Sequence, residues 1–336
     1  MHRLQDSGRN QGTSGQLIVP PPSEVTSLPG TVTQPAAYRG RFAPTPSGPL
    51  HLGSLLTAVA SYLDARAERG KWLVRIDDLD TPRIKPGATD LILRTLEALS
   101  LEWDETVSFQ SQNHAAYQEA LETILTQGLL YACECTRRET THPVIPEKGS
   151  CPGQCQKAKL TFRPGENALR IQTPEPPLVF HDRIKGWTER SLRSLCGDFI
   201  LFRRDKIYAY HLATVVDDHY LGITHVVRGE DLLDSTPQQI FLQHVLGYQT
   251  PIYTHTPLMI SPDGRKLSKS QGAPPVDPDQ AGRVIGFLLT QLGLPPSKSM
   301  EGASPQDLLA WAISQWNPSN LKGISPLVIH DNSIPV

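Results

Sequence analysis

The stretch that decides the fold reads Arg39-Gly40-Arg41-Phe42-Ala43-Pro44-Thr45-Pro46-Ser47-Gly48-Pro49-Leu50-His51-Leu52-Gly53-Ser54. Its apolar residues up to Ala43 predict a strand, and the Pro/Gly-rich segment that follows predicts a turn. The periodic apolar residues after the turn predict a helix. Because the first turn of a helix carries N–H groups without intrahelical acceptors, this strand–turn–helix places His51 beside a site where a phosphate can bind.

A second motif, Lys266-Leu267-Ser268-Lys269-Ser270, follows the turn dipeptide Asp263-Gly264 far downstream. It sets two ammonium groups and two hydroxyls on one short loop. Either motif alone is weak evidence, because a Pro/Gly-rich turn followed by a helix is common. Together, and in this order, they predict that a nucleotide phosphate chain is held between His51 at one end and Lys266 and Lys269 at the other.

The rest of the chain alternates strands with helices. We expect strands at 39–43, 72–77, 130–133, 168–172, 178–182, 198–203, 224–228 and 252–260, and helices at 52–69, 88–99, 113–127, 210–220, 237–246, 279–292 and 305–315. This alternation predicts an α/β fold, with a doubly wound, mostly parallel Rossmann-like sheet.

Five segments are expected. Residues 1–37 are rich in Ser, Thr, Pro, Gly and Gln, which predicts a disordered tail or translated sequence that the functional protein does not need. An RNA-binding arm fits less well, because Arg3 and Arg9 are its only Arg or Lys residues. The two halves of the sheet domain are placed at 38–132 and 196–275, an insertion at 133–195, and a short helical extension at 276–336.

Composition excludes several classes of protein. A net charge of −2 and a pI of about 6.6 over 336 residues exclude a globally basic nucleic-acid coat, so any RNA contact needs a local patch. No apolar stretch approaches the ~20 residues of a membrane span, and Leu17–Val19 is too short for a secretory signal. We therefore expect a cytoplasmic protein whose thiols stay reduced.

The cysteines form two close pairs, Cys133 with Cys135 and Cys151 with Cys155. Four thiolates at this spacing can close a tetrahedral zinc site, and zinc with four protein ligands is structural. The alternative is four unligated cysteines on loops, which we consider weaker because clustered, exposed thiols oxidise readily. The sequence therefore predicts one structural zinc ion per chain.

Two arginines are expected at strand ends, Arg41 before the turn and Arg228 after Val226 and Val227. Ligands of doubly wound sheets bind at such positions. The alternative for either arginine is a solvated surface side chain. Two guanidinium groups suit an amino acid with two carboxylates, which each can bind in bidentate fashion. Asp77 can then pair with the α-ammonium group, and Tyr210 can supply a hydroxyl.

The two motifs resemble the HIGH and KMSKS signatures of the class I aminoacyl-tRNA synthetases. The segments 41–48, 75–80 and 227–232 narrow the resemblance to the glutamyl group, and it covers roughly 39–316. It implies a Rossmann-like catalytic domain with a zinc-binding, acceptor-type insertion. It also implies activation of an amino acid by ATP and Mg²⁺.

The resemblance implies roles for individual residues. Catalysis is assigned to His51, Lys266 and Lys269; ATP binding to Pro44, His51, Gly53, Ser54 and Lys269; glutamate binding to Arg41, Phe42, Ala43, Pro44, Thr45, Asp77, Tyr210 and Arg228; and zinc binding to Cys133, Cys135, Cys151 and Cys155. Three positions depart from the family pattern. Ser54 replaces the last His of the HIGH signature, Asp77 stands where Glu is usual, and Cys151 stands where Tyr is frequent.

Only 67 residues follow Lys269, so we expect no helical anticodon-binding region of the kind that full glutamyl-tRNA synthetases carry. The chain most resembles the truncated paralogues, the glutamyl-Q tRNA(Asp) synthetases. That family activates glutamate without tRNA and transfers it to queuosine in the anticodon of tRNA(Asp). The implied partners are ATP, L-glutamate and the tRNA(Asp) anticodon stem-loop that carries queuosine, and we expect a monomer.

Two other functions stay open. The chain can be a glutamyl-tRNA synthetase-like enzyme that charges a tRNA 3′ end with help from another module. It can also be a non-catalytic, synthetase-like binding protein. Retention of His51, Lys266, Lys269, Arg41 and Arg228 argues against the second alternative.

Overall fold

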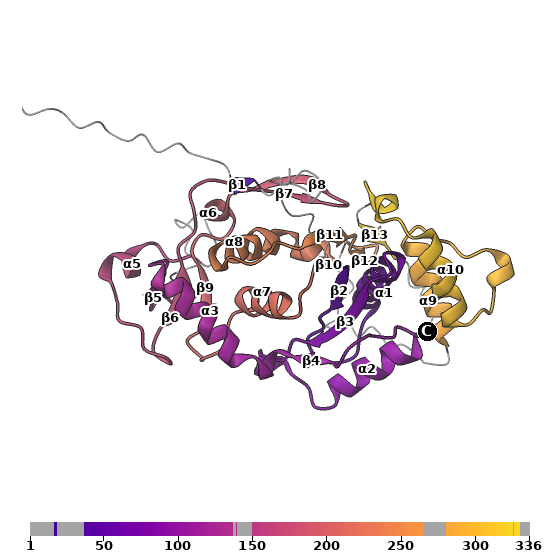
Figure 1. Ribbon diagram of the computed structural model, residues 1–336, viewed down its shortest axis with the longest axis horizontal. Helices are drawn as coiled ribbons and strands as arrows, with labels where there is room; N and C mark the ends of the chain where they lie inside the picture. The colour runs from indigo at the N-terminus through magenta and orange to yellow at the C-terminus, as the bar shows by residue number, and fades with distance from the viewer. Residues whose placement is uncertain are drawn as a thin grey trace, which may run out of the picture.

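The computed structural model describes residues 17–18, 37–136, 139, 150–264, 280–324 and 326–329. The expected loop with Lys266 and Lys269 lies outside the described residues. The expected tail does too, except for Leu17–Ile18, which form β1, and Ala37. Figure 1 shows the arrangement of the elements.

A parallel sheet forms the centre of the molecule (Figure 1). One half pairs in the order β2 (Arg39–Phe42), β3 (Lys71–Ile76), β4 (Ser108–Phe109), and the other in the order β10 (His225–Gly229), β11 (Ile252–Thr256), β7 (Leu178–Asp182), β1. The N–H of Thr224 donates to the carbonyl of Arg39 at 2.9 Å, so β10 lies beside β2. The strand order therefore reverses between β2 and β10, and such a reversal opens a ligand-binding crevice in doubly wound sheets.

Helices cover both faces of the sheet. A first apolar core includes buried residues of four helices, α1 (Leu52–Ala67), α2 (Ala88–Ala98), α9 (Ala281–Gln291) and α10 (Pro305–Gln315). A second apolar core includes buried residues of three helices, α3 (His114–Thr126), α7 (Tyr210–Tyr220) and α8 (Thr236–Leu246). Alternate residues of one strand enter different cores: Trp72 and Val74 the first, Leu73 the second. Burial of both faces explains why successive residues of β3 from Trp72 to Val74 are apolar. The predicted α/β fold is confirmed.

The insertion contains an antiparallel sheet of β5 (Leu130–Cys133), β6 (Ala168–Ile171) and β9 (Phe199–Phe202), with α5 (Gln154–Ala158) beside it. Its strands extend past the expected boundaries at 133 and 195. Conversely, β7 and β8 (Gly186–Arg190) form a hairpin whose β7 pairs with β11 of the central sheet. The difference arises because strand pairing joins segments far apart in sequence.

Other elements complete the fold. The expected strand 252–260 divides into β11 and β12 (Met259–Ile260), and Pro257, which has no N–H to donate, stands between them. β12 pairs with β13 (Leu327–Val328), and α6 (Leu192–Leu195) precedes β9. The short 3₁₀ segments are 81–83, 110–112, 230–235, 298–300 and 318–321.

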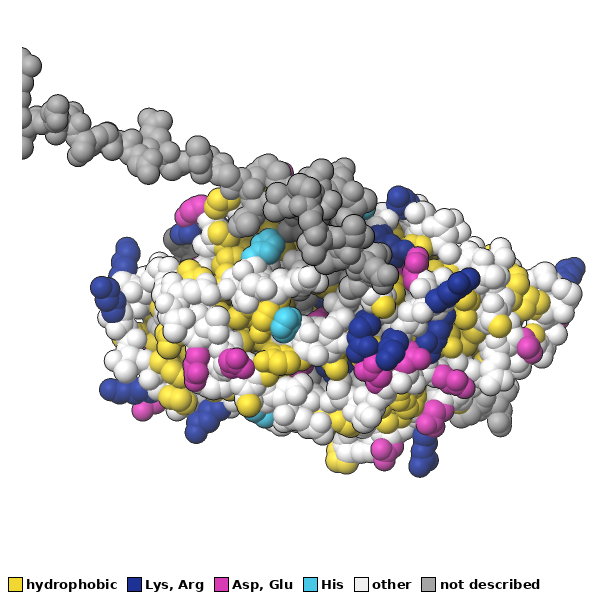
Figure 2. All heavy atoms as spheres, viewed as in Figure 1, with side chains coloured by type: hydrophobic (Ala, Val, Ile, Leu, Met, Phe, Trp, Pro, Cys, Tyr) yellow, Lys and Arg dark blue, Asp and Glu magenta, His cyan; other side chains and the backbone are white. Residues whose placement is uncertain are grey.

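The surface carries both signs of charge. On the face in Figure 2, Lys and Arg side chains lie among Asp and Glu side chains, in keeping with a net charge near zero. Among the described residues, no helix is both long enough and apolar enough to cross a membrane.

Candidate active site

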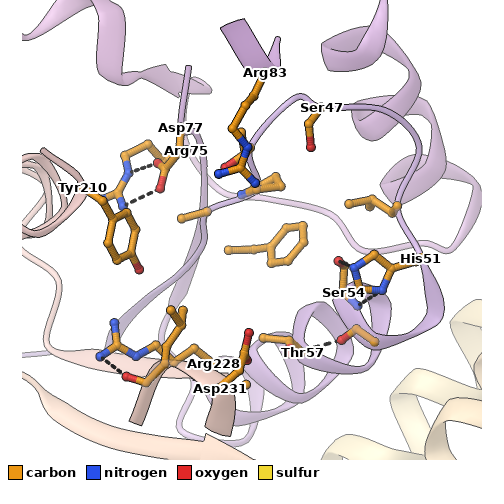
Figure 3. Close-up of a pocket in the computed structure, with 18 of the residues that line it drawn as sticks. Ser47, His51, Ser54, Thr57, Arg75, Asp77, Arg83, Tyr210, Arg228 and Asp231 are labelled. Atoms are coloured by element: carbon orange, nitrogen blue, oxygen red, sulfur yellow. Dashed lines mark hydrogen bonds and ion pairs between the residues drawn. The ribbon is translucent and has the colours of Figure 1, made fainter. Parts of the chain in front are cut away.

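A cavity of about 820 Å³ opens where the strand order reverses. It is lined by the ends of β2, β3 and β10 and by the first turns of α1 and α7 (Figure 3). The structure brings together every described residue expected to bind ATP or glutamate: Arg41, Phe42, Ala43, Pro44, Thr45, His51, Gly53, Ser54, Asp77, Tyr210 and Arg228. One cavity therefore contains the positions that the sequence placed at three strand ends and two helix starts.

His51 begins α1 as its N-cap residue. Its Nδ1 accepts a hydrogen bond from the N–H of Ser54 at 3.2 Å, and its Nε2 lies 2.9 Å from the Ser54 hydroxyl. Because Nδ1 accepts, a neutral imidazole carries its proton on Nε2 and donates it to the Ser54 oxygen. The hydroxyl hydrogen of Ser54 then points elsewhere and can donate to an anion. A serine here therefore keeps a donor at the start of the helix.

Arg41 and Asp77 belong to a buried network of charges. Both carboxylate oxygens of Asp218 accept from Arg41, at 3.0 and 3.1 Å, and Oδ1 also accepts from Arg75 at 2.6 Å. Arg75 donates through Nε to Asp77 at 2.7 Å. Burial opposes ionisation of Asp218, but Arg41 and Arg75 outweigh it and hold the pKa of Asp218 below its ordinary value.

This network changes the expected roles of two residues. Arg41 directs two of its donors to Asp218, so its charge is largely balanced within the protein. Asp77 pairs with Arg75, yet burial raises the pKa of its carboxyl to about 6 against the opposing effect of that guanidinium. An uncompensated cation such as a substrate ammonium group would therefore stabilise the ionised form of Asp77.

Arg228 lies in a different environment. Its guanidinium donates to Gln239 Oε1 and Thr236 Oγ1, both at 2.7 Å, and to His255 Nε2 at 3.0 Å, and it is only 4% exposed. All three acceptors are neutral, because burial lowers the pKa of His255. Among the described residues, no carboxylate lies within ion-pair distance of Arg228. Its charge is therefore available to an anionic ligand in the cavity.

Tyr210 occupies the first position of α7 and directs its hydroxyl toward the cavity (Figure 3). Three residues that sequence reasoning missed also line the cavity: the cationic side chains of Arg83 and Lys85, and Thr57, whose hydroxyl can donate a hydrogen bond. Arg83 and Lys85 follow β3 in a segment tied to the first motif, because the N–H of Lys85 donates to the carbonyl of Pro46 at 2.9 Å. The side of the cavity formed by the loop before α1 therefore carries more positive charge than the sequence motifs indicated.

The four expected metal ligands come together in the insertion. The Sγ atoms of Cys133, Cys135, Cys151 and Cys155 all lie within 4.8 Å of one another. Cys135 Sγ is 3.6 Å from Cys151 Sγ and 3.5 Å from Cys155 Sγ. Tetrahedral zinc with Zn–S bonds of about 2.3 Å requires sulfurs about 3.8 Å apart, so the cluster fits such an ion. The cluster can bind a metal.

Residues 37–282 match the family model of the catalytic domain of class I tRNA synthetases for E and Q. This chain is a class I (E and Q) tRNA synthetase. The family predicted from the HIGH-like and KMSKS-like motifs is thereby confirmed.

Relatives of this synthetase with curated names are similar over most of their length. One relative, from Ectopseudomonas mendocina (strain ymp), is named glutamyl-Q tRNA(Asp) synthetase and is 48% identical over 281 residues. The match covers 84% of this chain and 94% of the relative. Another with the same name, from Thiobacillus denitrificans, is 47% identical and covers 85% and 96%. The solved glutamate-tRNA synthetase from Elizabethkingia anophelis is 25% identical with a TM-score of 0.70, and the match covers 88% of this chain and 69% of that one.

The synthetase site also contains buried charges that sequence reasoning missed, namely Arg75, Asp217 and Asp218. Arg75 has no exposed surface, and Asp217 accepts from Tyr117 and Gln110. A signal was present in the sequence. Asp217 and Asp218 interrupt the apolar side of the helix 210–220. Because buried charges require partners, the two acids predict a buried cation such as Arg75 nearby.

Proposed function

We propose that this synthetase activates glutamate with ATP and transfers it to queuosine in the anticodon of tRNA(Asp). The observation that carries the proposal is the single cavity in which Arg228, with no carboxylate partner among the described residues, shares one hollow with the first turn of α1. The names of relatives with 46–48% identity support the same acceptor.

The first step joins glutamate to AMP. The α-carboxylate oxygen attacks the α-phosphorus of ATP, a P–O bond forms, and pyrophosphate leaves with the electron pair of the broken bond. A carboxylate is ionised at neutral pH, so the step needs positioning and charge stabilisation rather than a general base. We assign the side-chain carboxylate of glutamate to Arg228 and its ammonium group to Asp77. The phosphate chain then lies along His51, Ser54 and the first N–H groups of α1.

The second step moves the glutamyl group from the adenylate to queuosine, and AMP leaves. Mg²⁺ would accompany ATP and neutralise phosphate charge. The four-cysteine cluster would hold one zinc ion with a structural role in the insertion. The monomeric state and the cytoplasmic location expected from the sequence stay predictions, which size-exclusion chromatography and cell fractionation test.

Labelled glutamate tests the proposed function directly. The protein is incubated with ATP and labelled glutamate, together with tRNA(Asp) that either carries or lacks queuosine. We expect label on the queuosine-bearing RNA alone, and adenylate formation without any tRNA. Label at the 3′ end of tRNA(Glu) would instead identify the enzyme as a tRNA-charging one, and no ATP-dependent adenylate would identify a binding protein.

Lys269→Ala should slow adenylate formation by about two to three powers of ten, as expected for loss of one preorganised donor to the transferring phosphate. Lys266 would assist, so Lys266→Ala should have a smaller effect. ATP–pyrophosphate exchange measures both variants. An exchange rate equal to wild type in Lys269→Ala would remove the catalytic role proposed for this loop.

Glutamate activation should depend on pH through Asp77. Because the pKa of the Asp77 carboxyl is about 6, its anion is lost as the pH falls through that value. We expect kcat/KM for glutamate to fall up to about tenfold per pH unit below pH 6, with a smaller change in kcat because the bound ammonium group holds Asp77 ionised. Asp77→Asn should have a low but flat profile. A wild-type profile that stays flat down to about pH 5 would contradict the assignment of Asp77.

A further inference from the structure

A chain of buried groups extends behind Arg228. Asp182 Oδ2 lies 2.7 Å from His255 Nδ1, and His255 Nε2 lies 3.0 Å from Arg228 Nε. The three residues come from β7, β11 and β10, three neighbouring strands of the central sheet. Asp182 and His255 have no exposed surface, and neither of them lines the cavity. They therefore cannot touch a ligand there except through Arg228.

The hydrogen bonds define which atom donates and which accepts along the series Asp182, His255 and Arg228. Asp182 Oδ1 accepts from the N–H groups of Ile184 and Lys185, at 2.9 and 2.8 Å, which leaves Oδ2 for His255. Arg228 Nε can only donate, so His255 Nε2 must accept and the imidazole proton must lie on Nδ1. Thr236 Oγ1 lies 3.1 Å from the same Nε2, and its hydroxyl can donate to it as well. Burial, which lowers the pKa of His255, keeps the imidazole neutral with a single proton.

This arrangement orients a cation without cancelling its charge. A carboxylate bonded directly to Arg228 would compete with an anionic ligand, as Asp218 does for Arg41. A neutral imidazole instead holds the Nε edge of the guanidinium, while the carboxylate that sets the imidazole tautomer stays one residue farther away. The carboxylate is in turn held by the turn that follows β7, where Lys185 also pairs with Glu230 beside the cavity residue Asp231.

We propose that Asp182 and His255 are positioning residues for the amino-acid substrate: they hold Arg228 in the orientation that binds the side-chain carboxylate. The inference rests on the proposed function, because it assigns that carboxylate to Arg228. It predicts that binding of glutamate, and not of ATP, depends on the tautomer of one buried histidine.

Asp182→Asn tests this proposal with a change of nearly equal shape. The backbone N–H groups of Ile184 and Lys185 go on donating to an oxygen, which is now that of the Asn amide. The amide NH₂ therefore faces His255 and donates to Nδ1. The imidazole proton must then move to Nε2, where it opposes the N–H of Arg228 and meets the hydroxyl oxygen of Thr236, 3.1 Å away, instead. We expect KM for glutamate in pyrophosphate exchange to rise about 10- to 100-fold, with KM for ATP and kcat within about threefold of wild type, as for loss of ground-state binding.

Asp198→Asn is the matched control. Asp198 also accepts a backbone N–H, that of Thr173 at 2.8 Å, but it lies in the insertion away from Arg228. Its KM for glutamate should equal that of wild type. A similar increase in KM in both variants would show a general effect of losing a carboxylate and would overturn the proposal.

Nitrogen NMR of histidine-labelled protein supplies a readout that a purely structural role would not change. His255→Gln removes and so assigns the His255 signals. We expect the Nδ1–H tautomer in wild type and the Nε2–H tautomer in Asp182→Asn. An Nε2–H tautomer in wild type overturns the proposal even if the variant fails to fold, and so does an unchanged KM in a folded variant. Wild type that forms no glutamyl-adenylate at all would instead refute the proposed function.

Discussion

Replacing Arg228 by Met should reduce kcat/KM for glutamate activation by about 10²- to 10⁴-fold. Removing one partner from a buried, hydrogen-bonded charge site typically costs about 3–5 kcal/mol, and each 1.4 kcal/mol is a factor of ten. Here the loss has two parts. The substrate carboxylate loses its cation, and Gln239 Oε1, Thr236 Oγ1 and His255 Nε2 lose a shared donor. ATP–pyrophosphate exchange over a range of glutamate concentrations measures the effect.

Arg190→Met is the matched control for this variant. Arg190 pairs with Asp234 at 3.3 Å, and its side chain is 38% exposed, so the ion pair contributes little. We expect glutamate activation within about threefold of wild type. If Arg228→Met retained wild-type affinity for glutamate, the carboxylate would have to bind elsewhere, and Arg41 would be the alternative.

Replacing Cys155 by Ser should remove the metal and disorder the insertion around it. The buried cluster there consists of Tyr131, Cys133, Cys151 and Cys155, too few side chains for an independent core. Zinc binding contributes about 10–16 kcal/mol of folding free energy in isolated zinc modules. Apolar packing in this small cluster cannot supply a stabilisation of that size. We expect metal content to fall from one ion per chain to near zero, with transfer to tRNA lost while adenylate formation persists.

Cys196→Ser separates this effect from the loss of any thiol. Cys196 lies outside the cluster, where its Sγ contacts the carbonyl of Leu192 at 3.4 Å. Elemental analysis should find one metal ion per chain in this variant, and limited proteolysis should cleave only the Cys155→Ser protein within the insertion. An insertion in Cys155→Ser that resists protease without metal would show that the cysteines are not its structural centre.

Local sequence pattern predicted most of the secondary structure. The helix 210–220 and the strands 130–133 and 178–182 match the structure at both ends, because apolar periodicity reflects burial along one short segment. The strand β8 was missed, since Gly186–Arg190 offers few apolar residues and depends on pairing with β7. The insertion boundaries also differ, since β6 and β9 pair although their partner residues, from Ile171–Phe199 to Leu169–Phe202, lie 28 to 33 positions apart.

The sequence by itself determined that its motif residues would reach one crevice. The strand-end positions of Arg41, Asp77 and Arg228 and the helix start at His51 follow from local pattern, and these residues meet in the cavity. The spacing of the cysteines likewise predicted their separate cluster in the insertion. Only the tertiary structure decided how their charges are balanced. The charge of Arg41 is balanced by Asp218, which is 177 positions away, whereas among the described residues the side-chain acceptors of Arg228 are all neutral. Charge balance depends on distances of a few ångströms between separate elements, and no local pattern encodes those distances.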